Sequence, residues 1–153
     1  MRVVEFSVLG VAQPKGSARA FIPKGWKHPI VTSTNRNLKA WESLIATAAQ
    51  DAARGIFFDG PIALELRFRL PRPKSLPARV THHQTKPDLD KCIRALDALT
   101  GILWRDDAQV VAISAVKGYA PAGAPASLTV RVSAITVAQI EPLPLPLFEA
   151  AAG

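Results

Sequence analysis

The sequence predicts a single α/β (α+β) domain, in which a small mixed sheet packs against two main helices. Alternating apolar residues over 2–9 and 61–70 predict strands. Apolar residues at helical spacing over about 35–54 and 89–100 predict the two helices. The length of 153 residues suits about one domain. We therefore expect one domain over residues 1–138, followed by a Pro-rich C-terminal tail over residues 139–153.

The first half of the chain begins with the strand over residues 2–9. Residues 13–28 follow as a basic loop, because prolines and glycines interrupt any regular pattern there. A short strand is expected around Ile30–Thr32. Thr34 or Asn35 then caps the first helix, which ends before Gly55. The buried face of this helix is expected to hold Leu38, Trp41, Leu44, Ile45 and Ala48.

The second half begins with the clearest strand, residues 61–70, in which every second residue is apolar. A basic, Pro-rich loop over residues 71–87 leads to the second helix, which ends before Gly101. The buried stripe of that helix comprises Leu89, Cys92, Ile93, Leu96 and Leu99. Strands near residues 108–119 and 127–137 complete the domain, separated by a turn over 121–125.

Composition limits the class of protein. The single cysteine, Cys92, rules out an internal disulfide and suits a reducing compartment. No apolar run approaches the roughly 20 residues that span a bilayer, and Glu5 interrupts the only N-terminal apolar segment. We therefore expect a soluble, cytoplasmic protein without a membrane partner.

The charge distribution favours a nucleic-acid partner. The net charge is +7 and the pI is about 10.1, which suits binding to polyanions. Residues 1–86 hold fourteen basic and five acidic residues, whereas five aspartates occupy positions 88 to 107. An acidic island in a basic chain is what a nuclease needs, because carboxylates hold metal while basic surroundings hold phosphate.

The acids around the second helix have two interpretations. In the structural one, Asp88 caps the helix, and Asp90 lies near its positive end and pairs with Arg94. In the functional one, Asp88 and Asp90 face Asp107, and the repulsion between adjacent Asp106 and Asp107 is relieved by a cation. Magnesium prefers such oxygen ligands. No spacing typical of zinc sites and no phosphate-binding P-loop motif occurs.

Residues 86–111, KPDLDKCIRALDALTGILWRDDAQVV, resemble the signature of the RusA-type Holliday-junction resolvase family. QPKGSAR at residues 13–19 is similar to the loop that follows the first strand of that family. The resemblance implies a homodimeric crossover junction endodeoxyribonuclease of DNA recombination and repair, of phage or prophage origin. It would nick opposing strands of a four-way junction with Mg²⁺, or with Mn²⁺ as a substitute.

The resemblance also implies site residues. Asp88, Asp90 and Asp107 match the metal-binding carboxylates, Asp106 is a fourth contributor, and Arg94 matches an essential lysine of the family. Arg94 keeps the positive charge, but its planar guanidinium cannot donate a proton. Lys91 occupies a position where the family has asparagine, and the helix is one residue shorter than the family pattern. None of these departures removes a metal ligand.

Two further sets of residues complete the expectations. Six basic residues are candidate DNA-binding residues, although each alone could be solvated surface charge: Lys15, Arg19, Arg72, Lys74, Lys86 and Lys91. In the tail, Leu145, Leu147 and Phe148 are similar to the core of peptides that dock bacterial proteins on the sliding clamp, with Pro144 in place of the usual glutamine. Packing of the tail against its own domain or against a dimer partner is the alternative.

Two other functions stay open on the residues alone. The chain could be a structure-selective nuclease that prefers flaps or forks. It could also be a catalytically inactive DNA-binding protein that kept the same fold. The retention of all four acids argues against inactivity, because repelling carboxylates without a use would only cost stability.

Overall fold

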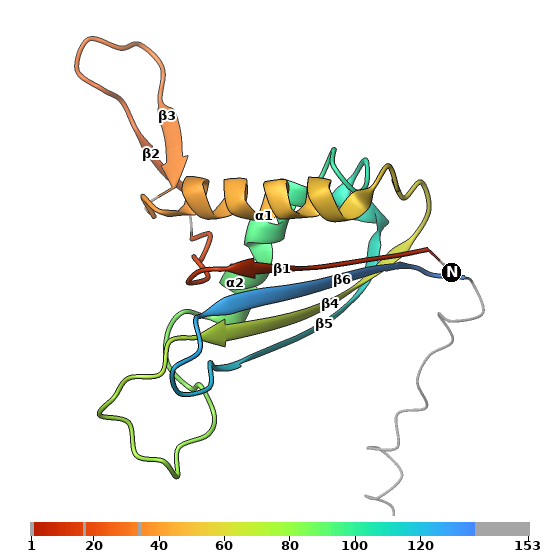
Figure 1. Ribbon diagram of the computed structural model, residues 1–153. Coiled ribbons are helices and arrows are strands. Elements are labelled where there is room, and N and C mark those ends of the chain that lie inside the picture. Colours follow the sequence, from red (N-terminus) through yellow and green to blue (C-terminus); the bar gives the residue numbers. More distant parts are fainter. Residues whose placement is uncertain (1, 17, 34, 137–153) are drawn as a thin grey trace, which may run out of the picture.

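The computed structural model describes residues 2–16, 18–33 and 35–136. Four strands form one mixed sheet in the order β1-β6-β4-β5: β1 (Val3–Leu9), β4 (Ile62–Leu70), β5 (Val110–Tyr119) and β6 (Ser127–Ala134). β4 is parallel to β5 and antiparallel to β6, which also pairs antiparallel with β1. The helices α1 (Leu38–Ala53) and α2 (Leu89–Arg94) cover one face of this sheet (Figure 1). The predicted α+β class is confirmed.

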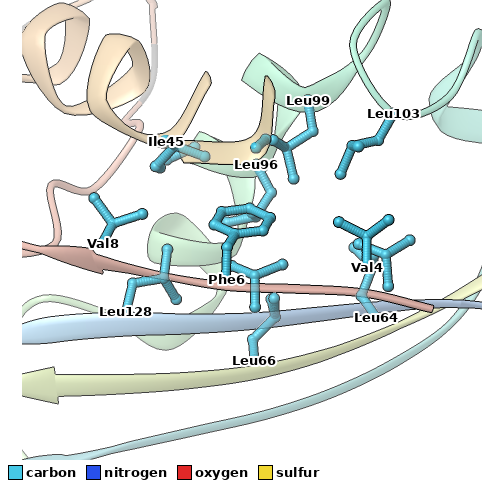
Figure 2. Packing of buried hydrophobic residues seen from close by; sticks show 14 of the residues in the cluster. Val4, Phe6, Val8, Ile45, Leu64, Leu66, Leu96, Leu99, Leu103 and Leu128 are labelled. Carbon is cyan, nitrogen blue, oxygen red and sulfur yellow. The ribbon is translucent and has the colours of Figure 1, made fainter. Parts of the chain in front are cut away.

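The core lies between the helices and the covered face of the sheet. All five alternate residues of β4 that were predicted to point inward are buried: Ile62, Leu64, Leu66, Phe68 and Leu70. In Figure 2, Val4, Phe6 and Val8 of β1 extend toward Ile45 of α1 and toward Leu96 and Leu99. Side chains from the sheet and from the helices thus meet in one core. The apolar residues that alternate along each strand therefore mark the face of the sheet that the helices cover.

The first helix begins later than predicted. The cap was expected at Thr34 or Asn35, but α1 begins after Asn37, whose backbone N–H donates to the side chain of Asn35. The predicted end is confirmed, since Arg54 and Gly55 both adopt positive φ. Leu44 was wrongly placed on the buried face and is exposed, while Ala49 and Ala53 are buried.

The second helix changes type in its middle. The predicted helix over about 89–100 is confirmed in its extent, but it is α-helical only to Arg94, since Ala95–Leu99 continues as the 3₁₀ helix η1. The apolar stripe nevertheless holds, with Cys92, Leu96 and Leu99 buried against the core. A 3₁₀ segment turns more tightly than an α-helix, and it leads into Gly101, which adopts a positive φ.

The basic segment over residues 13–28 is only partly a loop. Ala18–Phe21 forms strand β2, which pairs antiparallel with β3 (Ile30–Ser33) and makes a two-stranded hairpin. This hairpin projects from the N-terminal end of α1, away from the four-stranded sheet (Figure 1). The strand expected around Ile30–Thr32 is confirmed as β3.

The remaining elements follow the sequence closely. Residues 71–87 form an irregular loop, as predicted. The strand expected from 108 begins at Val110, because Asp107–Gln109 forms the short 3₁₀ helix η2. The predicted tail over 139–153 lies outside the described residues. In the described part of the chain, no helix is long and apolar enough to cross a bilayer.

Candidate active site

The turn that precedes β5 is fixed by a capping box. The Asp106 carboxylate accepts a hydrogen bond from the backbone N–H of Ala108 at 2.8 Å. The Gln109 side-chain oxygen accepts from the backbone N–H groups of Arg105 and Asp106, and its amide nitrogen donates to the carbonyls of Phe58 and Gly60. This network uses the Asp106 carboxylate structurally and fixes the backbone at Asp107.

Asp107 is held by two donors from the preceding segment. The Trp104 indole Nε1 donates to its carboxylate Oδ1 at 3.0 Å, and the Thr100 hydroxyl donates to the same oxygen. Trp104 is buried, whereas Asp107 is exposed. A buried indole and a hydroxyl therefore orient the carboxylate through one oxygen, and the other oxygen takes part in neither bond.

The start of α2 carries two ion pairs. Asp88 occupies the N-cap position, but its side chain makes no capping hydrogen bond to the helix backbone. Instead its carboxylate pairs with Lys91 at 3.0 Å. The hydrogen bond from Lys91 and the charge of Lys91 lower the pKa of Asp88, and the charges of Lys86 and Lys117 act in the same direction. Asp90 pairs with Arg94 at 3.4 Å, as the helical spacing predicts.

Lys117 connects β5 to the loop that leads into Asp88. Its ammonium donates to the Thr85 carbonyl at 2.7 Å and to the Pro87 carbonyl at 2.9 Å. These two carbonyls lie immediately before the N-cap of α2. The sheet therefore positions the Asp88 end of the helix directly, through a side chain that the sequence alone did not single out.

Of the candidate carboxylates, Asp88 and Asp107 line two different hollows, while Asp90 and Asp106 line neither of them. The first is lined by Gln13, Gly16, Asn35, Lys86, Asp88 and Lys91. The second is lined by Arg94, Asp97, Asp107 and apolar residues that include Trp104 and Ile113. Arg94 lines the second hollow and pairs with Asp90, four residues earlier on α2. The structure brings Arg94 and Asp107 to one hollow and places Asp88 in the other.

The donor set suits a hard divalent cation. Exposed carboxylates at positions 88, 90 and 107 are the oxygen ligands that Mg²⁺ takes in proteins. Across residues 2–16, 18–33 and 35–136, however, no three Asp, Glu, His or Cys side chains converge into a group that could hold a metal. The ligand chemistry therefore fits, while the carboxylates pair with Lys91, Arg94, Trp104 and Thr100 in this arrangement.

The candidate DNA-binding residues differ in their surroundings. Lys86 and Lys91 line the hollow with Asp88, and Arg19 and Lys74 are exposed. Lys15 instead pairs with Asp97 at 3.1 Å and with Glu42 at 3.7 Å. Arg72 donates to the carbonyls of Pro77 and Val80 and lies over the Tyr119 ring. Lys15 and Arg72 thus have structural partners within the chain.

Four residues of the site were not selected from the sequence. Asp97 lines the Asp107 hollow and pairs with Lys15. Thr100, Gln109 and Lys117 position the candidate carboxylates. The D-x-x-Q spacing from Asp106 to Gln109 is a sequence signal for a capping box. The contacts of Thr100 and Lys117 depend on the tertiary fold and have no such local signal.

Comparison with known proteins identifies a family. The family described as Endodeoxyribonuclease RusA matches residues 12–132. The chain is also similar to a Bacillus subtilis (strain 168) protein named "Uncharacterized protein YqaN", with 25% identity over 130 residues, which covers 78% of this chain and 89% of that protein. The matched range includes the β2–β3 hairpin, every candidate carboxylate and all residues that line the two hollows except Val11.

Proposed function

This chain belongs to the endodeoxyribonuclease RusA family, and on that premise we propose that it resolves four-way DNA junctions by paired nicks. The observation that carries the proposal is the family match over residues 12–132, which contains the acidic segment from Asp88 to Asp107. Paired cuts on opposing strands require two active sites, so we propose that the chain acts as a homodimer.

We assign the carboxylates of Asp88, Asp90 and Asp107 to a divalent metal, with Asp106 as a further contributor. When bound, Mg²⁺ (or Mn²⁺ in its place) supplies Lewis-acid stabilisation of charge on the phosphate oxygens. Trp104 and Thr100 orient the Asp107 carboxylate. Arg94, beside Asp90 and in the hollow with Asp107, supplies positive charge toward the scissile phosphate.

The basic residues around the first hollow support the DNA-binding role. Lys86 and Lys91 share this hollow with Asp88, so a phosphate seated there would meet two ammonium groups. We propose that Arg19 and Lys74 bind phosphates further along the strand, since both are exposed. If Lys15 and Arg72 also bound DNA, phosphates would have to replace their present partners, which are carboxylates for Lys15 and loop carbonyls for Arg72.

The cellular setting is proposed on the same premise. We place the protein in the cytoplasm, in DNA recombination and repair, with a phage or prophage origin. We also keep residues 139–153 as a tail separate from the domain. Docking on the sliding clamp through Leu145, Leu147 and Phe148 stays a proposal about residues that lie outside the described part of the chain.

A nicking assay tests the function. The purified protein is incubated with synthetic four-way junctions, flaps, forks and plain duplex, with Mg²⁺ or with EDTA. We expect Mg²⁺-dependent paired nicks in the junction and little cutting of duplex. Asp90→Asn should abolish nicking while junction binding is kept or tightened, because one metal ligand is lost together with its repulsion of phosphate.

The matched control is Asp51→Asn, which removes an exposed carboxylate from α1, away from both hollows. This variant should nick at the rate of the wild type. Faster cutting of flaps or forks than of junctions would favour the structure-selective nuclease instead. Binding without cutting at any Mg²⁺ or Mn²⁺ concentration would leave the inactive DNA-binding protein, and unimpaired cutting by Asp90→Asn would remove Asp90 from the site.

A further inference from the structure

The tip of the β2–β3 hairpin exposes large apolar side chains. Trp26 is 62% exposed, Ile22 is 60% exposed and Phe21 is 45% exposed. The other two tryptophans, Trp41 and Trp104, are 3% and 1% exposed. Scattered exposed apolar residues are ordinary, but three large ones within six positions form a cluster of the kind that marks an interaction site.

The charge of the hairpin indicates the chemistry of its partner. Residues 18–33 contain Arg19, Lys24 and Lys27 and no acidic residue, and all three basic side chains are exposed. Cations beside exposed aromatic rings are the combination that binds unstacked nucleic acid, because phosphates pair with the cations and bases stack on the rings. A purely apolar protein partner would not need three cations around the cluster.

The position of the hairpin relates its tip to the candidate site. Gly16 and Asn35, which flank the hairpin on either side, line the same hollow as Asp88 and Lys91. Figure 1 shows the hairpin projecting from the N-terminal end of α1, away from the four-stranded sheet. At about 3.3 Å per residue, the six steps from Gly16 to Ile22 reach at most roughly 20 Å. The tip therefore lies close enough to the hollow for one DNA molecule to contact both.

We propose that Trp26, Ile22 and Phe21 form a wedge that enters the branch point of the DNA and stacks against unpaired or splayed bases. The proposal rests on the proposed function, since it names the part of a branched substrate that the hairpin recognises. Continuous duplex has no such opening, so the wedge distinguishes branched from unbranched DNA.

Fluorescence of the DNA and of Trp26 tests the wedge without any cleavage. A four-way junction carries 2-aminopurine beside the crossover, and a second junction carries it in the middle of one arm. Both are titrated in EDTA with wild type, Trp26→Ala and Trp26→Phe. Emission of 2-aminopurine rises when the base loses its neighbours without stacking on another ring, so the probe replaces the base opposite the one on which the wedge stacks. Trp26 is the exposed tryptophan among Trp26, Trp41 and Trp104, so its quenching by DNA is readily assigned.

We expect the wild type to raise emission at the crossover and not in the arm. Trp26→Ala should remove this rise and weaken junction binding by about tenfold, the effect of losing one stacked base. Trp26→Phe should keep most of both, because its ring still stacks. The matched control is Val116→Ala, which removes an exposed apolar side chain from β5 and should leave both signals unchanged. Thermal unfolding of each variant checks that it folds.

The wedge is overturned if Trp26→Ala binds the junction and unstacks the crossover base as the wild type does, or if the wild type gives no rise at all. It is also overturned if anionic lipid vesicles, rather than DNA, change Trp26 emission. These outcomes are separate from the nicking assay. A protein that unstacks the crossover through Trp26 but never nicks would support the wedge and contradict the nuclease. A protein that nicks junctions, while Trp26→Ala changes neither binding nor 2-aminopurine emission, would support the nuclease and contradict the wedge.

Discussion

At the scale of single residues, the side chains of Trp104 and Thr100 hold the Asp107 carboxylate through hydrogen bonds to one of its oxygens. The D-x-D at the start of a helix and the adjacent acids before a strand single out Asp88, Asp90, Asp106 and Asp107. Their contacts depend on side chains that the fold brings near. Trp104, for example, is buried in the core, and only the structure reveals that its indole donates to Asp107.

This hydrogen bond predicts a specific defect in Trp104→Phe. The phenyl ring keeps most of the packing and removes the donor to Asp107, so the carboxylate loses one of its two positioning bonds. We expect the maximal nicking rate to fall about tenfold, the equivalent of about 1.4 kcal/mol and thus of one hydrogen bond. Junction affinity should stay near that of the wild type. Single-turnover nicking and binding titrations measure the two quantities separately.

Trp41→Phe is the control, because Trp41 is equally buried and its Nε1 has no hydrogen-bond partner in the described part of the chain. Both variants should lose stability through the smaller ring, on the order of 1–3 kcal/mol. Only Trp104→Phe should lose nicking beyond this shared effect. Equal nicking rates in the two variants would show that the indole of Trp104 acts through packing alone.

At the scale of elements, strands and helices with one buried face were predictable. β4 alternates without exception, so its five inward residues could be read directly. α2 and η1 share one apolar stripe, although the switch from α to 3₁₀ at Arg94 left no mark in the apolar spacing. β2 was missed because it belongs to a hairpin with both faces accessible, where no alternation of burial is required.

The contact between β5 and the 71–87 loop gives a prediction at this scale. Lys117→Met keeps the aliphatic stem but removes both hydrogen bonds to the Thr85 and Pro87 carbonyls. The start of α2 should then loosen, so backbone amides of residues 85–92 should exchange hydrogen faster than in the wild type. Nicking should fall several-fold because Asp88 is no longer held in one place. Hydrogen exchange read by mass spectrometry locates the change.

Arg67→Met on β4 is the matched control, since it removes a cation from an exposed position of the same sheet. It should leave exchange at residues 85–92 unaltered. Lys117→Arg is expected to restore part of the protection, because a guanidinium can still donate to carbonyl oxygens. Unchanged exchange in Lys117→Met would mean that the loop is held by its other contacts, such as Arg72 with the Pro77 and Val80 carbonyls.

At the scale of the whole molecule, net charge indicated a polyanionic partner but could not say which cations are available to it. The net charge of +7 is a property of the sequence. The fold assigns Lys15 to Asp97 and Glu42 and assigns Arg72 to the 71–87 loop. Replacing Lys15 or Arg72 would therefore lower the stability of the fold as well as the net charge. A resulting loss of DNA binding could then not be assigned to charge alone.

The salt dependence of junction binding separates available cations from the overall charge. Arg19, Lys74 and Lys86 are exposed on the hairpin, on the 71–87 loop and at the rim of the first hollow. If each of the three side chains meets a phosphate, the triple Ala variant should reduce the magnitude of the slope of log affinity against log salt by about 2 to 3, since each contact contributes about 0.9.

A control triple variant removes the same charge from exposed positions elsewhere: Arg2, Arg67 and Arg69. It lowers the net charge equally but should leave the slope nearly unchanged. If both triple variants reduce the slope by the same amount, binding follows overall charge, and no DNA path along the hairpin and hollow is needed to explain it.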